Sequence, residues 1–374
     1  MLKIYTITFH HAYNFGSMLQ TYALQEFVKK IALEKNETVD YGIINLYTPF
    51  QEELYAVLKQ NINAKNIIKN IMTIPYFNKL KEKNIKFNLF LEENCKLTKR
   101  FKNKEELEIA NLKADCFIAG SDQIWNIRAH DFNFSYLFDF LDDNQYRISY
   151  AASMGPKMID WVKYNKEKFE KYIKKFSYLS VREKNTYSML KDNFLESSNV
   201  NVDPTLLLRK NDWLNVASDM NYNNGEYIFV YCLEPSKEQI KIIKNISKIL
   251  NLPVVITKYY NKNDYFNSFI KMYNTGPQDF LSLINNAKLV LTSSFHGTVF
   301  SIIFQKKFFV FDGMKDNRIS EILEKSHLQE RSIDKKDYKK KILQDSNIDF
   351  LKSEEMIEEE QIRSMKYLIE ALKI

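Results

Sequence analysis

The sequence predicts an α/β protein with two doubly wound units, and three observations support this prediction. Short apolar runs typical of buried strands alternate, in two successive series, with longer segments whose apolar residues recur at helical spacing. A polar stretch, Asn221–Gly225 (NYNNG), separates the two series and is typical of a linker. With 374 residues, the chain is long enough for two domains of ordinary size. We therefore expect a parallel sheet in each half, with ligands beyond the carboxyl ends of the strands.

The first series covers residues 1–206 and contains a Lys- and Asn-rich insert at about residues 50–99. We expect the insert to form helices, with its lysines mostly on a solvated face. The expected strands are Leu2–Phe9, Thr38–Asn45, Ala114–Ala119, Arg147–Ser153, Tyr178–Arg182 and Val200–Pro204, and the expected helices are Gly16–Glu34 and Met158–Lys174. The linker is then residues 207–225.

The second series covers residues 226–345, and a closing segment, 346–374, follows it. The expected strands are Tyr227–Leu233, Val254–Thr257, Leu289–Leu291 and Lys307–Phe311, and the expected helices are Lys237–Leu250, Pro277–Asn286, Thr298–Phe304 and Arg318–Lys325. We expect a helix over Ser353–Ile374 in the closing segment. Its acidic residues lie in the first turn, where the helix dipole favours negative charge.

The stretch Lys288–Phe311 is the most informative part of the chain. A buried strand is followed by three hydroxyl residues that can cap a helix, Thr292, Ser293 and Ser294, and then by His296 and Gly297. This places His296 at the carboxyl edge of the sheet, beside backbone N–H groups that favour an anion. The alternative is that His296 only caps or packs.

Three further loops follow expected strands and carry polar residues. Asn14 and Gly16 follow the first strand, Gly120–Asn126 (GSDQIWN) follows the third, and Arg182 ends a short one. The single glycine at position 16 is only a weak signal for phosphate binding. The structural alternatives are a tight turn for Gly120–Asn126 and a surface ion pair for Arg182. Trp125 is expected to be a packing residue.

Net charge, cysteine content and the N-terminal pattern exclude some classes of function. The net charge of +7 is spread along the chain and lacks a dense basic stripe, so we expect no nucleic acid, although an anionic ligand or membrane surface is compatible. Three separated cysteines suit a reduced compartment, and no Cys/His cluster indicates a metal. His10 and His11 are expected to pack in their loop. The N-terminus lacks a signal-peptide pattern, so we expect a cytoplasmic protein.

Six segments together resemble the polysaccharide pyruvyl transferase family. They are HHAYNFGSMLQTYALQ (His10–Gln25), AGSDQIWN (Ala119–Asn126), SYAASMG (Ser149–Gly155), SVREKNT (Ser180–Thr186), VDPTLLL (Val202–Leu208) and TSSFHGTVFSI (Thr292–Ile302), with a weaker seventh, NRISEIL (Asn317–Leu323). The resemblance extends to about Leu328. Each segment is unremarkable alone, but their order is specific.

The resemblance implies a GT-B-like fold, in which two Rossmann-like domains, acceptor side first and donor side second, face each other across a cleft and a C-terminal helix closes the chain. It implies an enzyme that transfers the pyruvyl group of phosphoenolpyruvate to a hydroxyl pair of a surface-polysaccharide precursor, forming a cyclic ketal. The acceptor would be a sugar on a lipid diphosphate or nucleotide, with peripheral contact at the inner membrane face. No cofactor or metal is expected.

The resemblance also implies roles for individual residues. His296 would be the catalytic acid or base, with Arg182 and Arg318 as anion clamps. The remaining substrate-binding candidates are Asn14, Gly16, Ser121, Asp122, Gln123, Ser293, Ser294 and Gly297.

One position departs from the family pattern, and two alternative functions follow. Several relatives carry Arg two residues before this His, where this chain has neutral Ser294. Arg318 or Lys258 could then supply the charge, or the donor could differ. The alternatives are a GT-B glycosyltransferase with a nucleotide-sugar donor, and a non-catalytic relative that binds a sugar or an anion.

Overall fold

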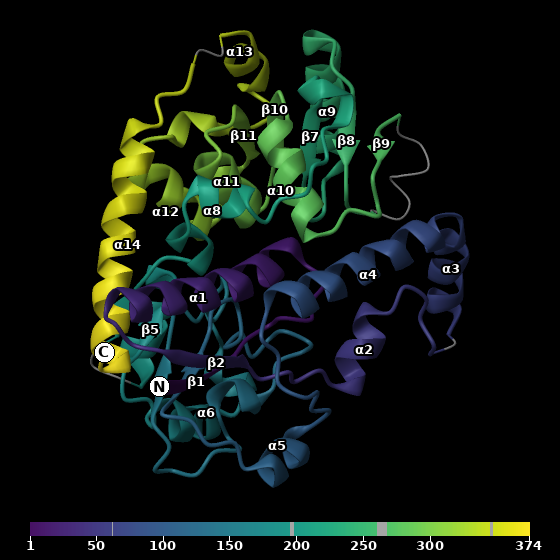
Figure 1. Cartoon of the computed structure of the whole chain (residues 1–374). Coiled ribbons are helices and arrows are strands. Elements are labelled where there is room, and N and C mark those ends of the chain that lie inside the picture. The colour runs from purple at the N-terminus through teal and green to yellow at the C-terminus, as the bar shows by residue number, and fades with distance from the viewer. Residues whose placement is uncertain (62, 195–197, 260–267, 345–346) are drawn as a thin grey trace. The chain divides into compact units, whose positions relative to one another are not determined.

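The computed structural model describes residues 1–61, 63–194, 198–259, 268–344 and 347–374 (Figure 1). The chain forms two compact units, each of which is described by itself. The first unit consists of Met1–Ala56, Leu89–Leu208 and Glu358–Ile374, and the second of Val57–Asn88 and Arg209–Ile357.

The first unit is built on a parallel sheet with the strand order β2-β1-β3-β4. A second parallel pair, β5 and β6, continues from β4 through single bridges. These strands are β1 (Leu2–Ile7), β2 (Val39–Ile43), β3 (Cys116–Ala119), β4 (Arg147–Ser149), β5 (Ser180–Val181) and β6 (Asn199–Val200). The order reverses between β1 and β3, which is the topological switch point at which doubly wound sheets bind ligands.

Helices connect the strands of the first unit, as parallel pairing requires. They are α1 (Phe15–Glu34), α2 (Pro49–Tyr55), α5 (Lys104–Ala110), α6 (Lys166–Ile173) and α7 (Lys184–Asn193), and the C-terminal part of α14 (Leu351–Leu372) also belongs here. The Tyr367 hydroxyl donates to the Ser149 carbonyl at 2.7 Å, so α14 packs against the end of β4.

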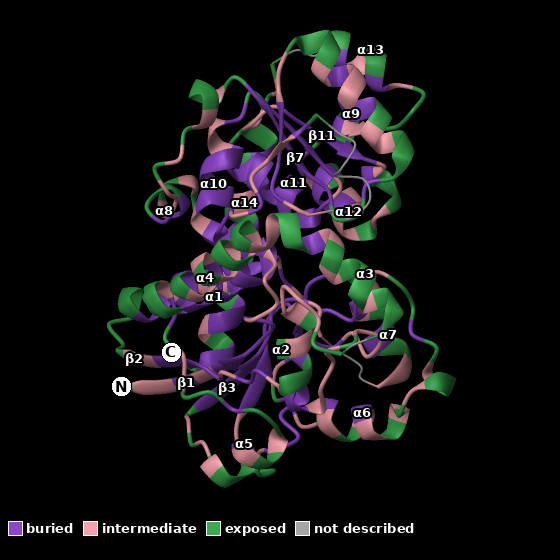
Figure 2. Ribbon diagram, turned by 90° about the vertical axis from the view of Figure 1, so that its right-hand side faces the viewer, coloured by how far each residue is buried: buried purple, intermediate pink, exposed green. Residues whose placement is uncertain are grey.

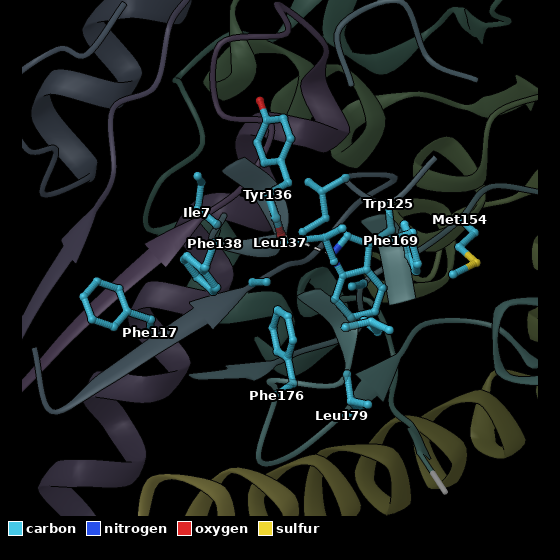
Figure 3. Packing of buried hydrophobic residues seen from close by; sticks show 14 of the residues in the cluster. Ile7, Phe117, Trp125, Tyr136, Leu137, Phe138, Met154, Phe169, Phe176 and Leu179 are labelled. Atoms are coloured by element: carbon cyan, nitrogen blue, oxygen red, sulfur yellow. Dashed lines mark hydrogen bonds between the residues drawn. The ribbon is translucent and has the colours of Figure 1, made fainter. Parts of the chain in front are cut away.

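An aromatic cluster fills the core of the first unit beside the sheet (Figure 3). Trp125 is fully buried in it, stands edge-on to Phe176 and donates its indole N–H to the Tyr136 carbonyl at 3.2 Å. The prediction that Trp125 is a packing residue is confirmed. Because Trp125 is anchored in this cluster, the Gly120–Asn126 loop is held at the carboxyl end of β3.

The second unit has a six-stranded parallel sheet with the order β12-β11-β10-β7-β8-β9. Its strands are β7 (Ile228–Tyr231), β8 (Val254–Ile256), β9 (Ile270–Lys271), β10 (Leu289–Thr292), β11 (Phe308–Phe311) and β12 (Ser332–Ile333). This is the strand order of dinucleotide-binding folds, and it reverses between β7 and β10. Both units are therefore Rossmann-like, as the sequence predicted, and strands such as β3, β7, β10 and β11 are buried along their whole length (Figure 2).

Some helices of the second unit start at residues that the sequence marks clearly. The unit's helices are α3 (Ala64–Thr73), α4 (Phe77–Asn94, up to Asn88), α8 (Lys210–Leu214), α9 (Lys237–Leu250), α10 (Pro277–Asn286), α11 (Phe295–Ile303), α12 (Asn317–Lys325), α13 (Tyr338–Leu343) and the start of α14. Ser236 and Gln239 form a reciprocal capping box at α9, and Pro277 begins α10. Both helices have the bounds that the sequence predicts.

Several expected elements differ from the structure, among them the strand expected over Arg147–Ser153, which ends at Ser149. The helix expected from Met158 begins only at Lys166, because Asn165 caps it, and the strand expected over Val200–Pro204 ends at Val200. Asp203 accepts from the Thr205 N–H at 3.1 Å and starts a 3₁₀ turn, which replaces the end of that strand. The expected linker contains α8, whose Trp213 is fully buried against Phe300.

The Lys-rich insert is helical, as expected, but it does not stay with the first unit. Residues 57–88 group with the second unit, and their lysines are not all solvated. Lys79 donates to the Lys271 carbonyl at 3.1 Å, and Lys86 pairs with Asp279 at 2.9 Å. Lys79 and Lys86 are about two helical turns apart, so the same face of α4 contacts β9 and α10.

Among the described residues, no helix is long and apolar enough to cross a bilayer.

Core packing of α9 can be tested with two isoleucines of one helix. Ile246 is fully buried, whereas Ile249 is 39% exposed. We expect Ile246→Ala to lower the free energy of unfolding of the second unit by about 2–5 kcal/mol, because the deletion leaves a cavity. Ile249→Ala should change it by less than about 0.5 kcal/mol. Urea unfolding followed by circular dichroism measures both, and equal effects would contradict this packing.

Candidate functional site

In the first unit, hydrogen bonds join the loops that follow β1 and β3 at the switch point. The Ser17 hydroxyl donates to Asp122 Oδ2 at 2.6 Å. The Thr8 hydroxyl donates to the Ser121 carbonyl at 2.9 Å, and the Ser121 N–H donates to Gln20 Oε1 at 3.1 Å. The two polar segments that the sequence singled out therefore form one cluster.

The predicted residues of these loops differ in what they can offer a ligand. Asn14 caps α1 by accepting from the Gly16 N–H at 2.9 Å. Ser121 is fully buried and donates to the Ala151 carbonyl at 2.7 Å, so its side chain positions the loop. Gln123 accepts from the Asn126 amide at 3.0 Å. Asp122 brings a charged group to this cluster, and its side chain is 13% exposed.

Arg182 lies at the centre of a buried charge cluster in the same unit. Its Nη1 is 2.9 Å from Asp203 Oδ2 and 3.7 Å from Asp122 Oδ1, and its Nε is 3.3 Å from Glu183 Oε2. The side chain of Arg182 is 3% exposed. Three carboxylates from three chain segments thus converge on one guanidinium.

The pKa of Arg182 follows from this arrangement. Burial lowers the pKa, but the three carboxylates outweigh burial and raise it above the ordinary value. With all three acids ionised, the cluster has a net charge of −2. Ser153 and Thr186 also donate to Glu183 Oε1, so hydroxyl groups stabilise the excess negative charge.

In the second unit, hydroxyl groups and one glycine shape the turn from β10 into α11. The Thr292 hydroxyl donates to the Tyr231 carbonyl at 2.6 Å and accepts from the Ser294 N–H at 3.0 Å. Ser294 is the N-cap residue of α11. A Cβ on Gly297 would lie 2.2 Å from Thr292 Oγ1, so only glycine allows the helix to approach the strand this closely.

His296 lies in the first turn of α11 and is 9% exposed. Its ring is edge-on to Phe295 at 5.2 Å, and the guanidinium carbon of Arg318 is 6.0 Å from the Phe295 ring centroid. Arg318 makes a bidentate pair with Asp316, at 2.7 and 3.1 Å. The structure therefore brings His296 and Arg318 to the same aromatic ring, at the carboxyl edge of the sheet.

His10 and His11 pack together, as the sequence predicts. The Asn45 side-chain oxygen is 3.1 Å from His10 Nε2 and 2.9 Å from His11 Nε2, and the His11 ring stacks on Tyr47 at 4.3 Å. Burial, with the His10 charge second, lowers the pKa of His11 to about 2, so both rings are neutral at ordinary pH. Within the described ranges, no group of three or more His, Cys, Asp or Glu could hold a metal ion.

A pocket of about 440 Å³ opens elsewhere in the first unit, and none of the predicted site residues lines it. The loop after β2, the N-terminal end of α2 and the chain around Phe132 and Tyr136 form its walls, together with Lys102, Lys104 and Asp131. Its size suits a small ligand.

Two solved structures share the fold of the whole chain. A Listeria monocytogenes protein assigned as a UDP-N-acetylglucosamine 2-epimerase matches with a TM-score of 0.52 and 10% identity, over 96% of this chain and 90% of that one. UDP-N-acetylglucosamine 2-epimerase from Rickettsia bellii matches with a TM-score of 0.51 and 10% identity, over 99% and 98%. At these identities the likeness concerns the fold alone. Two Rossmann-like units and a C-terminal helix define a GT-B-like protein.

The family is established by a separate comparison. A family model described as polysaccharide pyruvyl transferase matches residues 14–313. The chain therefore belongs to the polysaccharide pyruvyl transferase family, which the sequence motifs predicted. No curated protein matches the chain.

The buried charge cluster at Arg182 leads to a prediction about the stability of the first unit. We expect Arg182→Met to lower the free energy of unfolding of the first unit by about 3–5 kcal/mol, because it leaves buried carboxylates without their counter-charge. Lys113→Met is the matched control, because Lys113 pairs with Asp142 on the surface, and should cost less than about 1 kcal/mol. Urea unfolding at neutral pH measures both. A stable Arg182→Met protein would mean that the carboxylates are compensated by other groups.

Proposed function

We propose that this protein transfers the pyruvyl group of phosphoenolpyruvate to two hydroxyl groups of a sugar and thereby forms a cyclic ketal on a surface-polysaccharide precursor. Membership of the polysaccharide pyruvyl transferase family over residues 14–313 is the observation that supports this most strongly. The position of His296, at the start of α11 and at the sheet edge where ligands bind, is the structural support.

The proposed reaction needs proton transfer and charge stabilisation, but no oxidant or reductant. The methylene carbon of phosphoenolpyruvate takes up a proton, which makes C2 electrophilic, and one sugar hydroxyl adds to C2. The bond from C2 to the phosphate oxygen breaks, phosphate leaves, and the second hydroxyl closes the ring. One hydroxyl proton ends on the new methyl group and the other on phosphate. The demands on the protein are an acid or base and cations near the donor.

Two side chains of the second unit suit this chemistry, one as the proton carrier and one as the cation. His296 is the proposed acid or base, since histidine is the side chain that most often transfers protons in enzymes. Arg318 is the proposed partner of the donor anion, although Asp316 already takes up part of its charge. Ser293, Ser294 and the backbone at Gly297 are proposed to orient the donor.

The first unit is proposed to hold the acceptor sugar. Its candidates are Asn14, Gly16, Asp122 and Gln123, and carboxylate and amide groups are the usual partners of sugar hydroxyls. Contact between Arg182 and the donor anion stays a prediction, because three carboxylates already surround this guanidinium. In this proposal Arg182 chiefly fixes the position of the Asp122 carboxylate.

Removal of His296 tests the proposed chemistry. We expect His296→Ala to lower the rate of pyruvyl transfer by about 10²–10⁴-fold, the usual effect of losing a positioned acid or base. The assay measures phosphate release from phosphoenolpyruvate and pyruvyl gain on lipid-linked and nucleotide-linked sugars by mass spectrometry. His327→Ala is the control, because His327 is an exposed histidine of the same unit, and it should keep full activity.

Ligand stabilisation separates this proposal from its alternatives. A ligand that binds only the folded chain raises the melting temperature. Stabilisation by phosphoenolpyruvate supports the pyruvyl transferase, whereas stabilisation by UDP- or GDP-sugars without phosphoenolpyruvate would support a glycosyltransferase. A non-catalytic relative would bind its ligand equally well in the His296→Ala variant and show no turnover in either form.

A membrane-linked acceptor would also require a surface for the membrane, and we propose α3 for this role. Ile67, Ile68 and Ile71 are 45%, 58% and 61% exposed, and the lysines at positions 65 and 69 are exposed beside them. Residues 57–88 contain seven lysines and one glutamate, a net charge of +6 out of +7 for the whole chain. Exposed isoleucines beside clustered lysines fit an anionic lipid surface.

Vesicle sedimentation tests the membrane surface. We expect the protein to sediment with phosphatidylglycerol-containing vesicles and not with pure phosphatidylcholine, and Ile67→Ser with Ile71→Ser to abolish this binding, because apolar insertion is lost. Ile109→Ser is the control, since Ile109 is 84% exposed on the other unit. Equal binding of the double variant, or dimerisation through this face on gel filtration, would contradict the proposal.

A further inference from the structure

The pocket of about 440 Å³ in the first unit is separate from the predicted site residues but lies close to the loops that carry them. Its lining residues lie within 46–51, 102–105 and 130–136, so the pocket belongs to one unit. The segments 46–51 and 130–136 follow β2 and β3, whose carboxyl ends lie at the same edge of the sheet. The volume falls within the range of about 300–1,000 Å³ that is usual for small-ligand sites.

Side-chain hydrogen bonds hold two walls of this pocket together. The buried Gln51 amide donates to the Tyr136 hydroxyl at 3.2 Å. The Tyr55 hydroxyl, one turn further along α2, donates to Asp131 Oδ2 at 2.7 Å. Both bonds join α2 to the segment 130–136, so the pocket is preformed, as ligand sites usually are.

The same two tyrosines connect the pocket to the loop after β1. The Tyr136 ring packs edge-on against Phe9 at 4.8 Å between ring centroids, and Phe9 lies two residues beyond the end of β1. The Tyr55 ring packs edge-on against Tyr13 at 6.1 Å, and Tyr13 precedes Asn14. The Tyr136 hydroxyl points away from the other labelled side chains of the core (Figure 3). The pocket therefore borders the switch point between β1 and β3, where ligands bind.

The charges of the pocket lining cancel. Lys102 and Lys104 are its cations, and Glu105 and Asp131 are its acids, so the sum is zero when histidine is counted as neutral. Lys104 also pairs with the buried carboxylate of Asp139 at 3.3 Å, which takes up part of its charge. A lining without net charge suits a neutral ligand better than a phosphate group.

Aromatic surface lies beside hydrogen-bonding groups in this pocket. Phe50, in the first turn of α2, is 52% exposed, and Phe132 stands between Asp131 and Asn133 in the sequence. A carboxylate that accepts from one hydroxyl, as Asp131 does, has further acceptor sites, and an amide both donates and accepts. A sugar ring has an apolar C–H face and a rim of hydroxyl groups, so it can stack on an aromatic ring while such groups bind its hydroxyls.

We infer that this pocket binds a sugar residue of the acceptor other than the one that receives the pyruvyl group. The proposed partners of the reacting sugar lie on adjoining loops: Asn14 follows Tyr13, and the Asp122 loop is bonded to the pocket wall through the Trp125 indole and the Tyr136 carbonyl. The inference rests on the proposed function and narrows its substrate. The acceptor is then an oligosaccharide of at least two residues rather than a single sugar.

Binding of free saccharides to the full-length protein tests the pocket without turnover. The probes are mono- to tetrasaccharides of glucose, galactose, mannose and their N-acetylated forms, and saturation-transfer NMR measures binding. We expect at least one di- to tetrasaccharide to bind, and Phe50→Ala and Asp131→Asn each to weaken it about threefold to tenfold, the usual loss for one contact. An asparagine can still accept from Tyr55, so this wall stays in place. The matched controls, Ile109→Ala and Asp142→Asn, change exposed residues outside the pocket and should bind normally.

A purely structural pocket gives different results. Unchanged saccharide binding in both variants would overturn the inference, as would a protein that binds no saccharide of this panel. Weaker binding that appears only together with a lower melting temperature would give these residues a structural role and overturn it too. Binding of UMP in place of the sugars, lost in the same variants, would assign the pocket to a nucleotide.

Kinetics separate this site from the reacting centre. With an oligosaccharide acceptor, both variants should raise KM about threefold to tenfold at unchanged kcat, because the pocket binds the acceptor equally before and during the reaction. The rise should shrink with a single-sugar acceptor, which cannot occupy both places at once, and an equal rise would contradict the inference. The two proposals fail separately. Pocket-dependent saccharide binding without pyruvyl transfer would contradict only the proposed function, whereas pyruvyl transfer with KM unchanged in both variants would contradict only this site.

Discussion

Parallel pairing of every assigned strand in the two main sheets is the constraint on which the rest of the described structure depends. Because parallel strands end at the same edge, loops that are far apart in the sequence meet there, and the crossover connections must be long. The order of each sheet reverses once, so each edge has one crevice. The Asp122 loop follows β3 and the His296 turn follows β10, so each lies beside the crevice of its own sheet.

Strands and helices were predictable wherever local signals agreed with the tertiary structure. Helices α9 and α10 have clear caps, and their bounds match the expected ones. The motifs also located the residues that gather at each edge. By contrast, β9 and β12 were not expected, because each has two residues and lacks an apolar run of its own.

The side-chain partners were much less predictable than the positions. Arg182 was predicted to contact an anionic ligand because it ends a strand, and this contact stays a prediction. Glu183 is its neighbour in the sequence, but Asp122 and Asp203 come from other segments, and only the fold brings them to Arg182. The lysines of the insert were expected mostly on a solvated face. Lys79 and Lys86 instead contact β9 and α10, 192 and 193 residues further along the chain, which no local pattern encodes.

The two edges differ in charge, and this difference gives the proposed reaction a direction. In the first unit, three carboxylates outnumber the Arg182 guanidinium, which suits hydroxyl groups and disfavours an anion. In the second unit, His296 and Arg318 lie beside the same Phe295 ring at the sheet edge, which is where the anionic donor is proposed to bind. Ser294 is neutral, so in the proposed function the positive charge near this turn comes from Arg318.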